Sequence, residues 1–295
     1  MEYLSVTEAA ARWGLSPRSV RNYCASGRIP GAFLTGKTWN IPADAVKPGR
    51  KPRADSTAPT LLQVLRQEKA ANLPGGIYHK LQIDMTYNSN HIEGSRLTHD
   101  QTRLIFETHT LGVTQAALPV DDILETVNHF RCIDRVIDHA QRGISERFLK
   151  ELHRQLKAGT TDAARPWFVV GDYKKLPNEV GGHATTTPEQ VHQAIRALLV
   201  RYRPHEPKTF DQLLDFHVKF ERIHPFQDGN GRIGRLLLLS ECLRNDIVPF
   251  IITEELKGFY YRGLEQWDRE PGYLRDTCLT AQDYFRKVMA YFRVG

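Results

Sequence analysis

Two patterns typical of buried helices meet at one short polar segment, and this junction limits the fold more than any other feature of the chain. The segment is HPFQDGNGRIGR, residues 224–235. Before it, FDQLLDFHVKFERI has apolar residues at three- and four-residue spacing, and RIGRLLLLSECL after it also has the pattern of a helix. We therefore expect GNG to form a tight turn at a helix N-terminus, where glycines let backbone N–H groups approach an anion.

The arginines and the amide of this segment suit a di- or triphosphate. Arg232 and Arg235 are three residues apart, so we expect them to share a helix face and to point toward the anion. A planar guanidinium forms two parallel charged hydrogen bonds with a phosphate. Asn230 adds an amide donor at the turn.

Two further side chains bring reactive groups to the same place. Asp228 offers a hard oxygen ligand for Mg²⁺, and His224 is a base that is neutral near pH 7. Phe226, between polar neighbours, is expected in the core. A plain solvated turn would need none of these residues at fixed offsets, and a Walker A loop would need G-x-x-x-x-G-K-[ST], which the segment lacks.

The remainder of the chain predicts a mainly α fold in two parts. Residues 1–46 form a small module, residues 47–60 a linker rich in Pro and charge, and residues 61–295 a large helical domain. Helices of this domain are expected to begin near Leu61, Thr98, Ser145 and Thr187, with a capping box at the last of these. Residues 166–187 break the helical pattern and predict an irregular β-hairpin.

Segment 224–235 resembles the active-site motif of Fic-domain proteins, H-x-F-x-[DE]-G-N-G-R-x-x-R, and meets each of its fixed positions. The resemblance covers roughly residues 61–295. It implies an all-helical core that transfers AMP from ATP to a hydroxyl side chain of a protein, with His224 deprotonating the hydroxyl and Asp228 holding Mg²⁺. The phosphate-binding residues that it implies are Gly229, Asn230, Gly231 and Arg232 for the α- and β-phosphates, and Arg235 for the γ-phosphate.

A second segment, SNHIEG, fits two interpretations. Its local chemistry is that of a helix end followed by glycine. Beside a Fic motif, residues 82–94 also resemble the family's inhibitory segment, [ST]-x-x-x-E-[GN], with Ser89, Glu93 and Gly94 in the fixed places. A carboxylate paired with Arg235 would put negative charge where the γ-phosphate must lie. The resemblance also allows the same glutamate to orient a water that removes AMP, and the sequence does not decide between these roles.

The resemblance gives the predicted hairpin a docking role as a flap beside the active site. Such a flap holds its target by strand-like main-chain pairing, and the candidates here are Leu176, Asn178 and Val180. A purely structural hairpin is the alternative. The segment FYYRGLEQW resembles the family's adenine-side helix, in which Tyr260 or Tyr261 would line the nucleotide pocket or else belong to the core.

The N-terminal module predicts a different class of contact. LSVTEAAARWGLSPRSVRNYCASGRIPG reads as helix, turn and helix, with Thr7 capping the first helix and a short β wing afterwards. It resembles the DNA-binding helix-turn-helix domains of the excisionase and MerR type. The candidate DNA contacts are Arg18, Arg21, Asn22 and Lys37. Residues 1–53 hold nine Lys and Arg against three Asp and Glu, so they carry the whole chain's net charge of +6, which favours DNA. Many such modules bind protein instead.

Two classes of function follow. One is a self-inhibited adenylyltransferase that uses ATP and Mg²⁺ and modifies a Ser, Thr or Tyr hydroxyl of a partner protein or of itself. The other is a DNA-binding regulator whose Fic fold senses a nucleotide. The four cysteines form no C-x-x-C, the N-terminus has no signal-peptide pattern, and no apolar run is long enough to span a membrane. We therefore expect a cytoplasmic protein, and a homodimer is compatible with the sequence.

Overall fold

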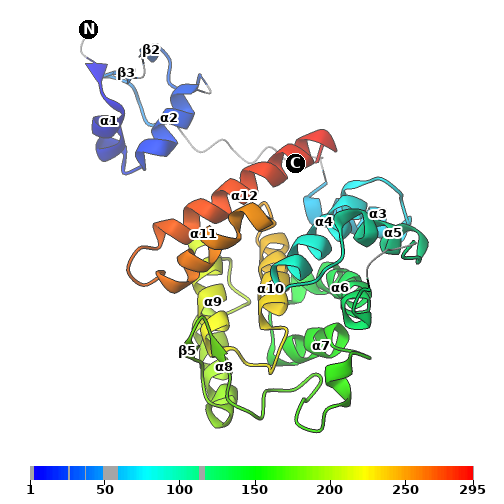
Figure 1. Cartoon of the computed structure of the whole chain (residues 1–295). Coiled ribbons are helices and arrows are strands. Elements are labelled where there is room, and N and C mark those ends of the chain that lie inside the picture. The colour runs from blue at the N-terminus through cyan, green and yellow to red at the C-terminus, as the bar shows by residue number, and fades with distance from the viewer. Residues whose placement is uncertain (1–2, 26, 37, 49–58, 113–116, 295) are drawn as a thin grey trace. The chain divides into compact units, whose positions relative to one another are not determined.

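The computed structural model describes residues 3–25, 27–36, 38–48, 59–112 and 117–294 (Figure 1). The chain divides into two compact units, Met1–Thr57 and Ala58–Gly295. Lys37, one of the candidate DNA contacts, and residues 49–58 of the predicted linker lie outside the described residues.

The N-terminal unit packs two helices against a three-stranded antiparallel sheet of order β1-β3-β2. Its elements are α1 (Val6–Trp13), α2 (Pro17–Ala25), β1 (Tyr3–Leu4), β2 (Phe33–Thr35) and β3 (Thr38–Pro42). The predicted cap at Thr7 is wrong. Ser5 caps α1 instead, in a capping box with Glu8, so the helix begins earlier and Thr7 falls inside its first turn. Gly14 ends α1 in the left-handed conformation.

The C-terminal unit is mainly helical, as predicted. Its α-helices are α3 (Leu61–Ala70), α4 (Ile77–Ile92), α5 (His99–Thr108), α6 (Val120–His139), α7 (Glu146–Leu156), α8 (Pro188–Tyr202), α9 (Phe210–Ile223), α10 (Asn230–Arg244), α11 (Glu254–Glu265) and α12 (Gly272–Tyr291). Two single-turn 3₁₀ helices, η1 (Ala140–Arg142) and η2 (Thr161–Ala164), follow α6 and α7.

Helix α10 lies in the middle of this unit and packs against α4, α6, α7 and α9 (Figure 1). Nearly all of its residues are buried. The run Leu236, Leu237, Leu238 and Leu239 turns apolar side chains to every side of the helix, and Arg232 and Arg235 are buried among polar partners. The core around it includes Leu65, Ile133, Leu149, Ile195 and Phe220. A buried central helix gives the GNG turn at its N-terminus a rigid base.

The predicted helix starts are correct in position, but one differs in mechanism. Thr98 and Gln101 form a capping box, and Ser145 caps α7. Thr187 occupies the N-cap position of α8 but its side chain makes no capping hydrogen bond. The backbone N–H of Gln190 instead donates to the Thr187 carbonyl at 3.0 Å, so the amide that a capping box would satisfy is already paired.

The predicted hairpin is present, but its strands are short. Strand β4 (Glu179–Val180) pairs antiparallel with β5 (His183–Ala184). Gly181 and Gly182 join the strands with positive φ angles of 57° and 77°, as a tight two-residue hairpin turn requires. Most of residues 166–187 therefore form an irregular loop, and only two residues of each strand pair with each other.

Candidate active site

His224 follows the last residue of α9 and takes the left-handed conformation, with φ of 50°. This turn carries its half-buried side chain off the helix. Its Nδ1 lies 3.1 Å from the carbonyl oxygen of Glu221, an acceptor, so Nδ1 carries the proton and Nε2 is the basic nitrogen. Burial lowers the pKa of His224, and the nearby Lys174 ammonium lowers it further, while Glu93 and Asp228 oppose them. The imidazole is therefore neutral near pH 7 and suited to accept a proton.

Asn230 closes the loop that follows. Its side chain accepts from the backbone N–H of Phe226 at 2.8 Å and donates to the Phe226 carbonyl at 2.8 Å. Both side chains are buried, and Phe226 is 0% exposed, as expected for a core residue. Both polar atoms of the Asn230 amide are therefore engaged with the loop backbone. Gly229, with φ of 80°, then starts α10.

Arg232 is buried and belongs to a cluster of charges that reaches the surface at Asp228. Its Nη2 lies 3.2 Å from Oδ2 of Asp228, and its Nη1 donates to Glu125 on α6. Lys157, 2% exposed, donates to Glu125 at 2.5 Å, to Asp228 at 2.7 Å and to Asp162 at 3.1 Å. Burial raises the pKa of Asp228, but Arg232 and Lys157 outweigh it and lower the pKa to about 2. Asp228 is therefore a carboxylate at every physiological pH.

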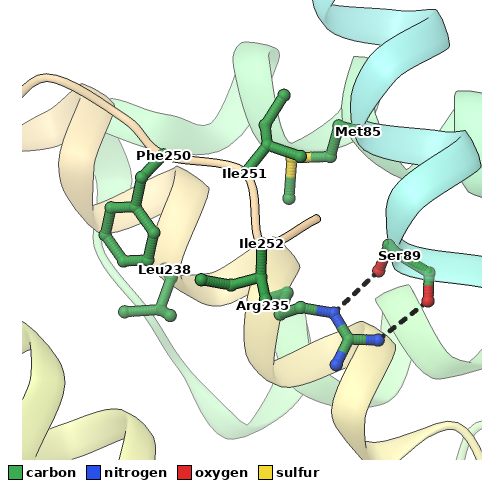
Figure 2. A pocket seen from close by; sticks show the side chains of 7 residues that line it. All are labelled: Met85, Ser89, Arg235, Leu238, Phe250, Ile251 and Ile252. Carbon is green, nitrogen blue, oxygen red and sulfur yellow. Dashed lines mark hydrogen bonds between the residues drawn. The ribbon is translucent and has the colours of Figure 1, made fainter. Parts of the chain in front are cut away.

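Arg235 engages a different acid. Its Nε donates to Ser89 Oγ at 3.0 Å and its Nη2 to the Ser89 carbonyl at 2.9 Å, as Figure 2 shows. Nη2 also donates to Oε1 of Glu93 at 2.6 Å. The pocket drawn in Figure 2 is a cavity of about 10 Å³, lined by Met85, Ser89, Arg235, Leu238, Phe250, Ile251 and Ile252. The two arginines that were expected to share one anion thus contact separate carboxylates in this structure.

The Glu93 carboxylate lies over the GNG turn. Helix α4 ends at Ile92, Glu93 is its C-cap, and Gly94 continues with φ of 96°. A Cβ placed on Gly231 would lie 2.3 Å from Oε1 of Glu93. An acidic oxygen therefore already occupies the space beside the helix N-terminus where we expect a phosphate.

The remaining candidate residues differ in exposure. Tyr260 is buried and its hydroxyl lies 2.5 Å from Nε2 of His217, whereas Tyr261 is exposed. Partial burial of its side chain, together with Glu93, raises the pKa of Tyr261 to about 12, so it stays a neutral phenol. In the flap, Leu176 and Val180 are exposed, but Asn178 points inward and donates to the Phe226 carbonyl at 3.0 Å. The candidate DNA contacts Arg18, Arg21 and Asn22 are exposed on α2.

Within the described part of the chain, no group of three or more His, Cys, Asp or Glu side chains could hold a metal ion. No helix among these residues is long and apolar enough to cross a membrane. The four cysteines are buried and unpaired with one another.

The sequence of the C-terminal unit matches a known family model. Residues 143–241, which contain the whole of segment 224–235, match the Fic/DOC family. The chain carries a Fic domain. Residues 3–47 match a helix-turn-helix domain, so the N-terminal unit is of that type.

Curated relatives match the Fic domain and its surroundings. "Protein adenylyltransferase Fic" of Nematostella vectensis is 28% identical over 184 residues, which is 61% of this chain and 42% of that protein. "Protein adenylyltransferase fic-1" of Caenorhabditis elegans is 26% identical over 184 residues, or 60% of this chain and 35% of that protein. The aligned part of the chain thus spans only about two fifths of these relatives.

Solved structures share the fold of the Fic domain. A Fic domain containing signaling protein from Bacteroides thetaiotaomicron superposes with a TM-score of 0.58 at 26% identity, covering 78% of this chain and 90% of that one. Fic-1 of C. elegans superposes with a TM-score of 0.57 at 20% identity, covering 78% of this chain and 70% of that one.

Proposed function

We propose that this protein is a protein adenylyltransferase that transfers AMP from ATP to a hydroxyl side chain of a protein. The observation that carries the proposal is the placement of a neutral His224 at the end of α9, one loop away from the anion-binding N-terminus of α10. Two arginines, Arg232 and Arg235, extend from the first turns of that same helix. Relatives named protein adenylyltransferase support the same activity.

In the proposed reaction, Nε2 of His224 accepts the proton of a Ser, Thr or Tyr hydroxyl. The hydroxyl oxygen then forms a bond to the α-phosphorus of ATP, and the bond from that phosphorus to the bridging oxygen breaks to release pyrophosphate. Arg232 and the N-terminus of α10 stabilise the charge that develops on the phosphates. Arg235 is placed for the γ-phosphate, which favours ATP over nucleotides that lack one.

The residues present fit Mg²⁺ bound together with the nucleotide. Mg²⁺ usually takes one or two protein carboxylates and completes its shell with phosphate oxygens and water. Asp228 is such a carboxylate, with its side chain 49% exposed and therefore open to a hydrated ion. Asp228 would hold Mg²⁺, and the bound ion would neutralise negative charge on the phosphates of the nucleotide.

Glu93 keeps the resting site inactive in this proposal, because it holds Arg235 and occupies the space beside Gly231. The test is label transfer from α-³²P-ATP with Mg²⁺ by wild type, Glu93→Gly, and Glu93→Gly combined with His224→Ala. We expect label on the protein itself or on a lysate protein with Glu93→Gly alone. If Glu93→Gly binds ATP but no variant transfers label, the adenylyltransferase proposal is wrong.

We propose DNA as a second partner, because residues 3–47 match a helix-turn-helix domain and Arg18 and Arg21 are exposed on α2. The full chain should bind duplex DNA with an affinity that falls steeply as salt increases. The double variant Arg18→Ala with Arg21→Ala should bind DNA more weakly. The slope of its log affinity against log salt concentration should also fall by the equivalent of about two phosphate contacts. Binding that is absent, or unchanged in the double variant, would contradict this role and favour a protein partner.

A further inference from the structure

Lys174 is a buried cation at the root of the flap. Its side chain is 3% exposed. Its ammonium donates to Asn178 Oδ1 and to Thr185 Oγ1 at 2.6 Å each, and it lies 3.5 Å from the carbonyl oxygen of Ile223. No carboxylate of the described residues forms an ion pair with it, although a fully buried lysine ordinarily has such a partner.

The partners of Lys174 lie on both sides of the hairpin and at the end of α9. Asn178 precedes β4 and Thr185 follows β5, so the ammonium holds both limbs of the hairpin together at their base. Ile223 is the residue before His224, so the same ammonium also touches the end of α9. One buried group thus joins the flap to the backbone that carries the candidate base.

Backbone contacts extend this connection along the loop after His224. The backbone N–H of Lys174 donates to the Pro225 carbonyl at 2.9 Å. Asn178 donates to the Phe226 carbonyl at 3.0 Å, and the N–H of Leu176 donates to Oε1 of Gln227 at 3.1 Å. The flap root is therefore bonded to each of the three residues that follow His224.

We propose that Lys174 is a positioning residue, which fixes the flap against residues 223–226 and so sets where a docked target hydroxyl lies relative to His224. The inference rests on the proposed adenylyltransferase function. The target's main chain would pair with the flap, while the proton acceptor lies at the end of α9. Movement of the flap relative to the end of α9 would shift the hydroxyl relative to Nε2 of His224. A misplacement of about 1 Å can lower the rate about a hundredfold.

The positive charge has a second consequence at His224. The charged groups around this imidazole are Lys174, which favours the neutral form, and Glu93 and Asp228, which favour the protonated form. Glu221 faces it only through its backbone carbonyl. A neutral residue at position 174 would remove the one lysine of this set and let the two carboxylates raise the pKa of His224. A positioning residue without charge would leave that pKa unchanged.

The experiment compares Lys174→Met with Lys175→Met, because Lys175 is the exposed neighbour in the same loop. Both are made in the full chain, in the Glu93→Gly background for the kinetics and in otherwise wild-type protein for hydrogen exchange and the His224 titration. We expect Lys174→Met to lower kcat for protein modification about 10- to 100-fold, with ATP affinity within about twofold of the parent. Hydrogen exchange should become faster at the amides of residues 176–185, and the NMR titration of His224 should move to higher pH. Lys175→Met should change none of these, and Lys174→Arg should restore part of the rate.

Exchange and His224 titration do not depend on AMP transfer, so they decide this inference even if the proposed function fails. If the amide exchange of residues 176–185 and the titration of His224 are the same in Lys174→Met as in Lys175→Met, the positioning role is overturned. If Lys174→Met does not fold, Lys174→Gln removes the charge while keeping a long polar side chain in the same place. Faster flap exchange in that variant supports the role, and exchange equal to the parent's overturns it.

Discussion

Arg235 and Glu93 are 142 positions apart in the chain, yet Nη2 of Arg235 donates to Oε1 of Glu93 across 2.6 Å. The same Oε1 lies where a Cβ on Gly231 would have to go. One carboxylate oxygen therefore both pairs with the arginine placed for a γ-phosphate and occupies the N-terminal turn of α10. In the proposed binding mode, a nucleotide with a γ-phosphate would meet this oxygen, whereas a shorter nucleotide would avoid it.

Removing the Glu93 carboxylate should therefore improve ATP binding more than AMP binding. A hydrogen bond to a charged group contributes about 1.5–3 kcal/mol, so Glu93→Gly should tighten ATP by about 10- to 100-fold. AMP affinity should stay within about threefold. Isothermal titration calorimetry with both nucleotides measures the difference. Glu93→Gln keeps the shape without the charge and should fall between wild type and Glu93→Gly. An equal gain in affinity for AMP would mean that Glu93→Gly changes the whole site and does not act on the γ-phosphate position alone.

Lys157 should prove to be the internal counter-ion of three carboxylates. It pairs with Glu125, Asp162 and Asp228 while 2% exposed. Lys157→Met removes one cation from these acids, while Arg232 still pairs with Glu125 and Asp228 and Arg165 still pairs with Asp162. We therefore expect a loss of about 1.5–3 kcal/mol in the free energy of unfolding. Mg²⁺ should recover part of this loss, because the freed carboxylates are ligands that it favours and a ligand of the folded state stabilises it.

Thermal unfolding with millimolar Mg²⁺ and with EDTA tests this prediction. The Tm of Lys157→Met should rise with Mg²⁺ by more than that of wild type. Lys150→Met is the control, because Lys150 lies on α7, the helix that Lys157 follows, and pairs with Glu146 and Asp172 instead of Asp228. If Mg²⁺ does not change the Tm of Lys157→Met, these three carboxylates do not form a cation site.

The sequence predicted local features well because they depend on neighbouring residues. The apolar spacing before His224 gave a helix over residues 210–223, and α9 spans Phe210–Ile223. The charge cluster around Arg232 could not be predicted in this way. Glu125 lies 107 positions from Arg232 and Lys157 lies 71 positions from Asp228. A lysine or glutamate is ordinarily solvated, so only the packing of α6, α7 and α10 reveals that Lys157 is 2% and Glu125 15% exposed.

The same limit applies to side-chain direction. Three-residue spacing correctly puts Arg232 and Arg235 near each other on α10, but Glu125 and Glu93 draw their guanidinium groups to separate partners. In the flap, alternation alone does not show that Asn178 turns inward to the Phe226 carbonyl. Which partner a long polar side chain reaches depends on charges brought in by distant segments, and no local pattern records them.

Two glycines of α11 should respond in opposite ways to alanine. Gly258 is exposed with open space around it, so Gly258→Ala should stabilise the protein by about 1 kcal/mol through helix propensity. A Cβ at Gly263 would lie 2.6 Å from Cα of Leu274, so Gly263→Ala must push α11 and α12 apart and should cost about 1–3 kcal/mol. Chemical denaturation of both variants measures the two effects, and equal signs would contradict this packing.

Glu221 should make the protein less stable as pH rises. Its Oε1 is buried without a hydrogen-bond partner among the described residues, 3.9 Å from Nε2 of His217. Burial raises the pKa of Glu221 from 4.5 to about 8, with Arg235 opposing and Glu93 adding to the rise. Between these two pH values the folded chain holds a proton that the unfolded chain has released. The free energy of unfolding therefore falls through this window as pH increases.

Glu221→Gln removes the titration while keeping the shape of the side chain. We expect the variant to match wild type near pH 5 and to gain a few kcal/mol over it by pH 8. Urea unfolding of both proteins at several pH values gives this difference, in which titrations shared by the two proteins cancel. Glu265→Gln, an exposed position on α11, is the control and should follow wild type at every pH. Parallel curves for Glu221→Gln and wild type would show that the pKa of Glu221 does not rise on folding.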